Sequence, residues 1–368
     1  MINVYVSGAS GAVGTRFVQY LIDGERDVEL VLISSTITGY ERLQEKFGVY
    51  KNVHIQKIDN LCCINTDAQN YFINFAFISD GVPWARIRRN FVLIKTLANF
   101  SKANDFKGYV EISSQSVFGF RLESTVDVNS SFGFWCEEYG LTKRAGEKAA
   151  EKSLKNSSTR LSIIRLGNVF FRESGPFTQR IFNIYFSRHF SSLNQDGYVN
   201  GTLLENAIAG IWHVALNVDE ASFKNIYHFS EISEVKWSDI YKLIDCQFEG
   251  YRRVLLGEKG AEVTRPSLVI YLTTILKSKY AAPIIRFFSV SVPDRINVML
   301  HSIYRRKRPM NYNQVSHFDD SVLEAFSESN QFKCHYPATF DFPINPANTS
   351  QALRAIYLNH IELQDLSS

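Results

Sequence analysis

The chain has 368 residues, with 40 basic against 37 acidic side chains and a formal net charge of +3. This length can bury the core of one large α/β domain or of two domains. The nearly balanced charge gives no general attraction to nucleic acid or to a membrane. Five cysteines without metal-like spacing argue against a disulfide framework and favour a reducing, cytoplasmic setting. No signal-peptide pattern precedes the first motif, and no apolar run reaches the length of a transmembrane helix.

The first 170 residues alternate short β-rich runs with amphipathic helical stretches. Strands are expected at Ile2–Ser7, Val28–Ser34, Val53–Ile58, Tyr71–Ala76, Tyr109–Ser113 and Leu161–Leu166. Helices are expected at Thr15–Asp23, Ile87–Asn104 and Glu138–Lys155. This alternation predicts an α/β fold of Rossmann type, a doubly wound parallel sheet with helices on both faces.

Beyond residue 170 the alternation loosens. Helices are expected at Leu203–Val218 and Trp237–Phe248, and Ile226–Phe229 is the clearest strand, which could return to the sheet. We therefore expect an NAD(P)-binding domain at 1–170 and a smaller, mainly substrate-binding region at 171–368. Residues 277–308 hold eight basic side chains and one acidic one. That segment fits a solvated helical face, an oligomer contact, an anion-binding lid or attachment to an acidic membrane surface.

A GxxGxxG pattern lies between the first expected strand and the first expected helix. Glycines permit a tight turn and a close approach of the backbone to a pyrophosphate, and the helix N-terminus offers N–H groups to that anion. The pattern predicts a dinucleotide site formed by Gly8, Ser10, Gly11, Ala12, Val13 and Gly14.

The second strand ends in hydroxyl residues rather than in a carboxylate. Sites that prefer NAD commonly place an acid here, to bind the ribose 2′-hydroxyl. Ser34 and Ser35 could instead donate to a 2′-phosphate, with charge from Arg16 or Arg42. The sequence therefore favours NADP over NAD. Asp59, after the third strand, is a candidate for the adenine amino group or an ordinary turn residue.

Tyr139 and Lys143 form a YxxxK pair at the start of an expected helix, where a spacing of four puts both side chains on one face. A tyrosine can act as a base near neutral pH when positive charge stabilises its phenolate, and a lysine can supply that charge and also hold ribose hydroxyls. The spacing alone is a weak signal in a chain with 18 tyrosines. Ser114, at the end of an upstream strand, supports it as a hydrogen-bonding partner for a reacting oxygen.

Six motifs in a fixed order carry a family resemblance: Gly8–Gly14, Asn74–Ala76, a helix with Asn90, Ser113–Gly119, Tyr139–Lys143 and Arg165–Phe170. The segment His335–Pro337 adds a looser match near the end. In these motifs the chain resembles the extended short-chain dehydrogenases/reductases, the NAD-dependent epimerase/dehydratase family that includes enzymes modifying nucleotide sugars.

The resemblance implies site residues and partners. It makes Ser114, Tyr139 and Lys143 a catalytic triad and places Ser114, Gln115 and Asn168 at the substrate, although Asn168 could also simply cap a turn. It implies a small-molecule substrate, a nucleotide sugar in the first place, and leaves a homodimer open. No nucleic-acid partner is expected, because the charge is nearly balanced. No metal is expected either, since the eight histidines show no metal-like spacing.

Two departures from the family pattern narrow the activity. Gln115 and Ser116 stand where sugar dehydratases usually carry an Asp-Glu pair, which disfavours dehydration. No arginine precedes Leu203–Ile211, so either the basic 277–308 segment binds the diphosphate or the substrate lacks one.

The expected function is an NADP-dependent ketoreductase or dehydrogenase acting on a nucleotide-linked or other small carbohydrate, with Tyr139 as general acid/base. A nucleotide-sugar epimerase with tightly bound NAD is the alternative, and a non-catalytic NADP-binding regulatory protein is the second. Cys136 could serve an epimerase as another acid/base or be a packing residue.

Overall fold

The computed structural model describes residues 2–24, 27–64, 68–119, 125–133, 136, 138–172, 197–218, 221–240, 331–346, 351–353 and 355–356. The basic 277–308 segment and most of the expected Trp237–Phe248 helix lie outside these ranges. Within them, no helix is both long enough and apolar enough to cross a bilayer.

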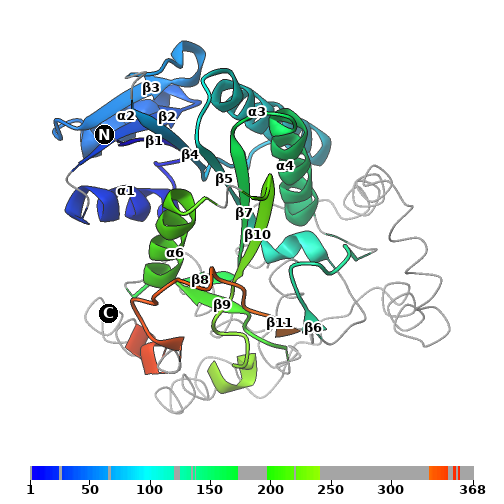
Figure 1. Cartoon of the computed structure of the whole chain (residues 1–368). Coiled ribbons are helices and arrows are strands. Elements are labelled where there is room, and N and C mark those ends of the chain that lie inside the picture. The colour runs from blue at the N-terminus through cyan, green and yellow to red at the C-terminus, as the bar shows by residue number, and fades with distance from the viewer. Residues whose placement is uncertain are drawn as a thin grey trace, which may run out of the picture.

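A seven-stranded sheet organises the described chain, in the order β10-β7-β5-β4-β1-β2-β3 (Figure 1). All its neighbouring strands are parallel. The strands are β1 (Ile2–Ser7), β2 (Val28–Ser34), β3 (Val53–Lys57), β4 (Gln69–Asn74), β5 (Gly108–Ser114), β7 (Arg160–Leu166) and β10 (Lys224–Phe229). The strand order reverses between β1 and β4, and in open parallel sheets ligands bind outside the carboxyl ends of the strands at this switch point.

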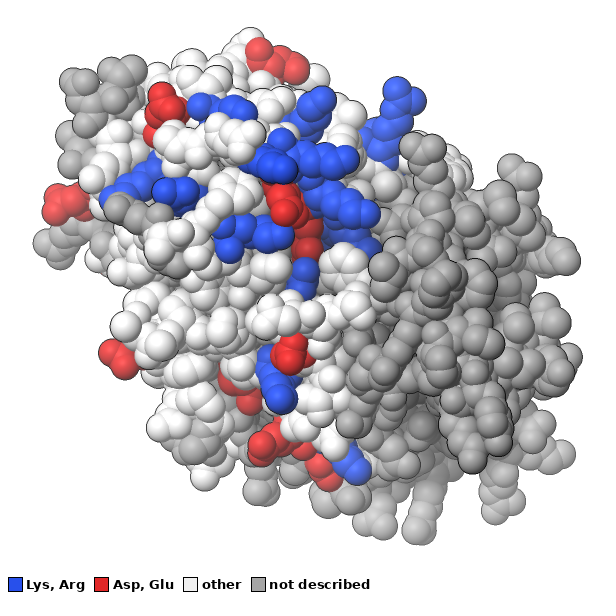
Figure 2. Space-filling view, turned by 45° about the vertical axis from the view of Figure 1, so that its right-hand side comes forward, with Lys and Arg blue, Asp and Glu red and all other residues white. Residues whose placement is uncertain are grey.

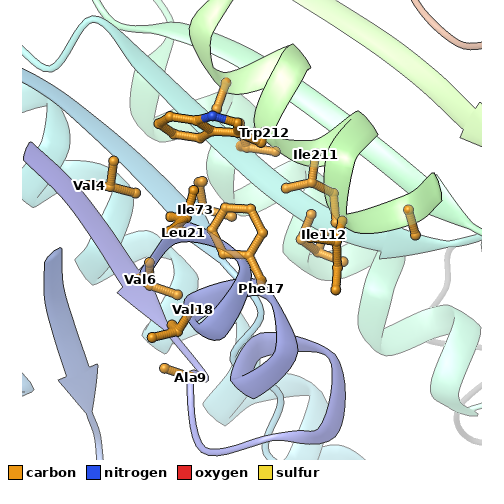
Figure 3. Close-up of a cluster of buried hydrophobic side chains, with 14 of the residues drawn as sticks. Val4, Val6, Ala9, Phe17, Val18, Leu21, Ile73, Ile112, Ile211 and Trp212 are labelled. Carbon is orange, nitrogen blue, oxygen red and sulfur yellow. The ribbon is translucent and has the colours of Figure 1, made fainter. Parts of the chain in front are cut away.

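Helices cover both faces of the sheet (Figure 1). On one face lie α1 (Ala12–Gly24), α2 (Ile37–Phe47) and α6 (Leu204–Leu216), whose apolar side chains share one core with the sheet. Figure 3 shows Phe17 of α1 at the centre of this core, with Val6 of β1, Ile112 of β5 and Trp212 of α6 around it. On the other face, α3 (Pro83–Ala103) and α4 (Glu138–Leu154) enclose a second core rich in aromatic residues.

The outer surface of α3 and α4 is basic. Figure 2 shows Lys and Arg side chains gathered on the face that is turned forward there. Helix α3 has five basic residues and no acidic one. The exposed lysines of the two helices and the turn after α4 are Lys95, Lys102, Lys148, Lys152 and Lys155. We call these five residues the α3–α4 basic face.

Smaller elements lie beyond the carboxyl ends of the sheet. Strand β8 (Asn168–Phe170) pairs with β9 (Gly201–Leu203), and β6 (Thr125–Val126) pairs with β11 (Gln331–Phe332). Two 3-10 helices, η1 (Ile58–Asn60) and η2 (Gln115–Phe118), follow β3 and β5.

The described C-terminal segment, residues 331–346, packs back on β10 and α6. Tyr336 stacks on Phe229 with ring centroids 3.9 Å apart, and its hydroxyl donates to Glu231 over 2.9 Å. The same carboxylate accepts from Leu203 N and Asn206 Nδ2. One partly buried acid therefore joins this segment to the β9–α6 junction.

The expected fold class is confirmed, since the described chain forms a parallel α/β sheet covered by helices on both faces. Helix α2 is an addition that the sequence reading did not name. Thr36 caps its N-terminus, with its hydroxyl accepting from Gly39 N over 3.0 Å, and Leu43 and Phe47 bury its inner face. Helix α3 begins earlier than expected, at Pro83, a residue favoured in the first turn of a helix.

Candidate active site

The glycine turn occupies the sheet's switch point. Gly8 has a positive φ of 74°, and a Cβ there would lie 2.5 Å from Ala76 N, in the chain that leaves β4. A Cβ on Gly14 would lie 2.4 Å from Gly8 O. Gly11, in contrast, is exposed and would meet only Gly8 O, at 3.3 Å. Two glycines thus close the turn onto the fold, while the backbone at Gly11 stays open to a ligand.

Ala12 and Val13 begin α1 directly after this turn. The first N–H groups of a helix have no partner within the helix, and the helix dipole favours an anion beside them. The arrangement fits the pyrophosphate of a dinucleotide.

A pocket of about 420 Å³ adjoins the glycine turn, between α1 and α2. Its polar lining consists of Ser10 of the turn, Thr15 of α1, and two basic side chains and one acidic side chain of α2, Arg42, Lys46 and Glu45. Ser34 lies beside it but is buried, and its hydroxyl is engaged locally, donating to Thr36 O over 2.9 Å. Ser35 is exposed at the end of β2, and Asp59 is exposed in η1 after β3.

Tyr139 and Lys143 project from the first turns of α4. The Tyr139 side chain is 40% exposed, whereas Lys143 is buried with its Nζ donating to Ile112 O over 2.8 Å. Phe77, which follows β4, contacts both of them. Its ring centroid lies 5.1 Å from that of Tyr139 and 5.3 Å from Lys143 Nζ. An aromatic face thus orients the phenol ring and attracts the ammonium group.

Ser114 ends β5 at the same edge of the sheet. Its Oγ accepts from Ser116 N over 3.2 Å and so caps η2. Helix α4 starts against η2, since a Cβ on Gly140 would lie 2.2 Å from Ser116 O. Gln115 is buried, and its amide nitrogen has no hydrogen-bond partner in the described part of the chain. Because an unpaired buried donor is costly, it is a candidate for binding an oxygen of a ligand.

Two ion pairs hold α4 in place. Arg86 of α3 pairs with Glu138, the residue before Tyr139, at 2.8 Å. Deeper in the protein, Arg165 of β7 binds Glu147 with nitrogen–oxygen distances of 2.9 and 2.8 Å. Ser113 Oγ donates to the same carboxylate over 2.6 Å. The helix that carries the YxxxK pair is therefore fixed to both the sheet and its neighbouring helix.

A hydrogen-bonded polar chain runs beneath the site, from the glycine turn towards α4. Ser7, the last residue of β1, donates to Asn74 Oδ1 over 2.5 Å, and Asn74 Nδ2 donates to Glu111 over 2.8 Å. Tyr109 donates to the same carboxylate oxygen over 3.2 Å. Burial raises the pKa of Glu111 to about 7. The positive charge of Lys143 and the two hydrogen-bond donors act in the opposite direction and lower it, but by less.

Other candidates have structural contacts. The Asn168 amide donates to Val199 O over 2.7 Å and so joins β8 to the chain before β9. Cys136 is fully buried with its thiol directed at Ser116 O over 3.3 Å, which is typical of a packing residue. The described residues hold no group of three or more acidic, histidine or cysteine side chains arranged for a metal.

The comparison with protein families places this geometry in a class. Residues 4–202 match the NAD dependent epimerase/dehydratase family, so the chain belongs to that family. Its cofactor is accordingly a nicotinamide dinucleotide. No protein with a curated description matches the chain in sequence.

Solved structures of low sequence identity share the fold. A UDP-N-acetylglucosamine 4-epimerase from Methanobrevibacter ruminantium, in complex with UDP-N-acetylmuramic acid, is 17% identical with a TM-score of 0.53 and covers 67% of this chain and 82% of its own. A UDP-glucuronic acid 4-epimerase from Bacillus cereus, with NAD, is 16% identical with a TM-score of 0.50, covering 78% and 99%. A human epimerase family protein with NADPH is 16% identical with a TM-score of 0.50, covering 73% and 85%.

Three residues of the candidate site escaped the sequence reading. Phe77 lies beyond the strand-end motif and had no signal of its own. Lys46 follows Arg42 by four residues. Had α2 been predicted, this spacing would have placed both side chains on one face of the helix. Glu111 was visible as an acid inside an otherwise apolar strand, which is a rare position for an unpaired charge.

Proposed function

We propose that the chain is an NADP-dependent ketoreductase or dehydrogenase of a nucleotide-linked or other small carbohydrate, with Tyr139 as general acid/base. The observation that carries this proposal is the half-exposed phenol of Tyr139 one helical turn before the buried Lys143, with the Phe77 ring against both, at the carboxyl edge of a dinucleotide-binding sheet.

In the direction of reduction, the Tyr139 hydroxyl gives its proton to the carbonyl oxygen of the substrate. Lys143 stabilises the phenolate that remains, because its positive charge is held by a hydrogen bond inside the protein. Ser114 donates a hydrogen bond to the same substrate oxygen and orients it. The bound cofactor supplies the hydride. In the direction of oxidation the same groups act in reverse.

NADP is preferred in this proposal because of the pocket beside the glycine turn. Arg42 and Lys46 lie one helical turn apart on α2 and line it together with Ser10. Two cations and a hydroxyl suit the 2′-phosphate of NADP, and the two cations outnumber the single carboxylate, that of Glu45, in the lining. Ser35 and Asp59 would contact the adenosine half of the cofactor, whereas the hydroxyl of Ser34 already donates to the backbone oxygen of Thr36. Lys143 would also hold the nicotinamide ribose.

The substrate would lie beyond the carboxyl ends of β5 and β7. Gln115 offers its unpaired amide nitrogen there, and Asn168 begins β8 nearby in the chain. The solved epimerases with a similar fold carry UDP-linked ligands in their complexes, which supports a nucleotide sugar as the first substrate class. A second copy of the chain, in a homodimer, is the other partner we propose.

Consumption of NADPH with a 4-keto sugar nucleotide tests the reaction. Wild-type protein should oxidise NADPH, and Tyr139→Phe should lose at least about a hundredfold in turnover, since the general acid is removed. Affinity for NADPH should change little. Tyr20→Phe is the matched control, because Tyr20 is also 40% exposed but lies on α1. Equal turnover in wild type and Tyr139→Phe would refute the assigned role.

An epimerase with retained NAD is the second candidate. Two solved epimerases of different specificity share the fold. It predicts that NAD co-purifies with the chain and that a nucleotide sugar is interconverted without net change in the cofactor. Identification of the co-purified dinucleotide by mass spectrometry, followed by NMR of the sugar products, separates the two candidates.

A further inference from the structure

Glu111 is a buried carboxyl group that the proposed reaction does not use. Only 1% of the residue is exposed, and it stands in the middle of β5 with Asn74 of β4 and Ile163 of β7 beside it in the sheet. A buried acid without compensation costs several kcal/mol, so its contacts should reveal what compensates it.

The contacts of Glu111 lead to both halves of the cofactor site. Through Asn74, its carboxylate is linked to Ser7, which directly precedes the glycine turn. On the other side, Lys143 donates to the carbonyl of Ile112, the next residue along β5. Helix α4 crosses close above, since a Cβ on Gly146 would lie 3.7 Å from Glu111 Oε1.

The charges that face Glu111 come from α4. Lys143 is the charge that most favours its ionised form, and Glu147 opposes ionisation. Glu147 is itself paired with Arg165. Tyr109, on the same strand, is neutral because burial raises its pKa well above the usual value. Lys143 is thus the positive charge that most favours an ionised Glu111 and, in the proposed function, the holder of the nicotinamide ribose.

We propose that Glu111 is a positioning residue whose proton sets the preference of this site for the oxidised over the reduced cofactor. The oxidised nicotinamide ring carries one positive charge more than the reduced ring. An ionised Glu111 offsets the charge of Lys143 and so favours the oxidised form, whereas a protonated Glu111 leaves Lys143 uncompensated and favours the reduced form. This inference rests on the proposed function for the role of Lys143.

Cofactor binding measures the effect without any substrate. Affinities of wild type for NADP⁺ and NADPH, and for NAD⁺ and NADH, are measured between about pH 6 and pH 8.5, a range that brackets the Glu111 pKa of about 7. The ratio of oxidised to reduced affinity should rise by roughly threefold to tenfold as the pH passes 7, as expected for one charge acting through a partly screened interior.

Two variants connect that rise to Glu111. In Glu111→Gln the ratio should stay at its low-pH value throughout, because the amide keeps the hydrogen bonds to Asn74 and Tyr109 and carries no charge. In Tyr109→Phe the carboxyl remains but loses a donor to its ionised form, so the rise should move to higher pH. Glu151→Gln is the control, since that acid lies on the outer side of α4 in an ion pair with Lys224.

Each outcome bears on the inference. A ratio that does not change with pH in wild type, or that changes equally in wild type and Glu111→Gln, would overturn it. If Glu111→Gln does not fold, Tyr109→Phe still tests the inference. A pH midpoint of the affinity ratio that is the same in Tyr109→Phe and wild type would overturn it. A chain that shows this pH dependence but reduces no 4-keto sugar nucleotide would refute the proposed reaction alone. A chain that binds no dinucleotide would refute both.

Discussion

A single methyl group at Gly8 would test how the glycine turn is built. The residue has a φ of 74°, where L-residues other than glycine are strained, and the added Cβ would meet backbone atoms of Ala76 and Phe75 that cannot move aside. Gly8→Ala should therefore lower the free energy of unfolding by at least about 1–2 kcal/mol. Thermal denaturation measures this. Gly24→Ala, with no atom within 4 Å of its new Cβ, should stabilise slightly or not at all. Equal melting temperatures would contradict the described turn.

Glu111 gives the stability of the protein a pH dependence. Its pKa is raised from an ordinary value of 4.5 to about 7, so the folded chain holds this proton where the unfolded chain has lost it. Stability should consequently fall as the pH rises from about 4.5 through 7, and the full cost is roughly 3 kcal/mol above pH 8. Glu111→Gln removes this loss. Urea unfolding at pH 5 and pH 8 measures the free energy of unfolding of both proteins. The variant should become more stable relative to wild type at pH 8, and an equal difference in stability at both pH values would contradict this expectation.

In the proposed function, helix α2 distinguishes NADP from NAD. Replacing Arg42 and Lys46 together by glutamine removes both positive charges that line the pocket beside Ser10. The affinity for NADP⁺ should fall about tenfold or more, because charge-assisted hydrogen bonds to the phosphate are lost. Affinity for NAD⁺ should be nearly unchanged. Lys51→Gln, an exposed charge before β3, is the control. A parallel loss of NADP⁺ and NAD⁺ affinity would place the 2′-phosphate elsewhere.

The sequence predicted the strands of the main sheet because buried parallel strands read as continuous apolar runs. Val28–Ser34 was predicted with the bounds that β2 has. Helix α2 was harder to predict, since its apolar side chains are few and its start depends on one hydroxyl cap at Thr36. The paired elements β8 and β9 were not predictable either, because each is three residues long and is defined by its partner.

At the site, a local sequence pattern was enough to select Tyr139 and Lys143, because their spacing of four residues places both on one helix face. It was not enough for Phe77, which meets them only because β4 and β5 are neighbours in the sheet. It also missed the role of Glu111, whose partners come from β4 and α4. Contacts between residues far apart in the chain are set by the fold as a whole.

For the whole molecule, the α3–α4 basic face bears on the proposed homodimer. A two-fold contact through it would set the same lysines of two copies against each other. Association through this face should therefore strengthen as salt screens the repulsion, with the dimer fraction rising between about 50 and 500 mM salt. Sedimentation velocity measures that fraction, and Lys95→Glu should raise it at low salt. A dimer that weakens as salt increases would have to use another surface.

Tyr336 connects the C-terminal segment to the β9–α6 junction. Its hydroxyl donates to Glu231 and lies 3.2 Å from that of Thr202 in β9, while its ring stacks on Phe229 and Phe340. Because β9 pairs with β8, loss of this contact should disturb Asn168 at the start of β8 more than the distant glycine turn.

We therefore expect Tyr336→Ala to cost about 2–4 kcal/mol of stability, somewhat less than for a fully buried aromatic residue, and to raise KM for the sugar more than the Kd for the cofactor. Tyr336→Phe keeps the stack and should cost only about 1–3 kcal/mol, because one oxygen of the Glu231 carboxylate loses its donor. Thermal denaturation with saturation kinetics and cofactor titration on both variants checks this order. If both variants weakened cofactor and sugar binding equally, the C-terminal segment would stabilise the whole sheet rather than the substrate side. Only a general destabilisation of the fold would also affect the glycine turn.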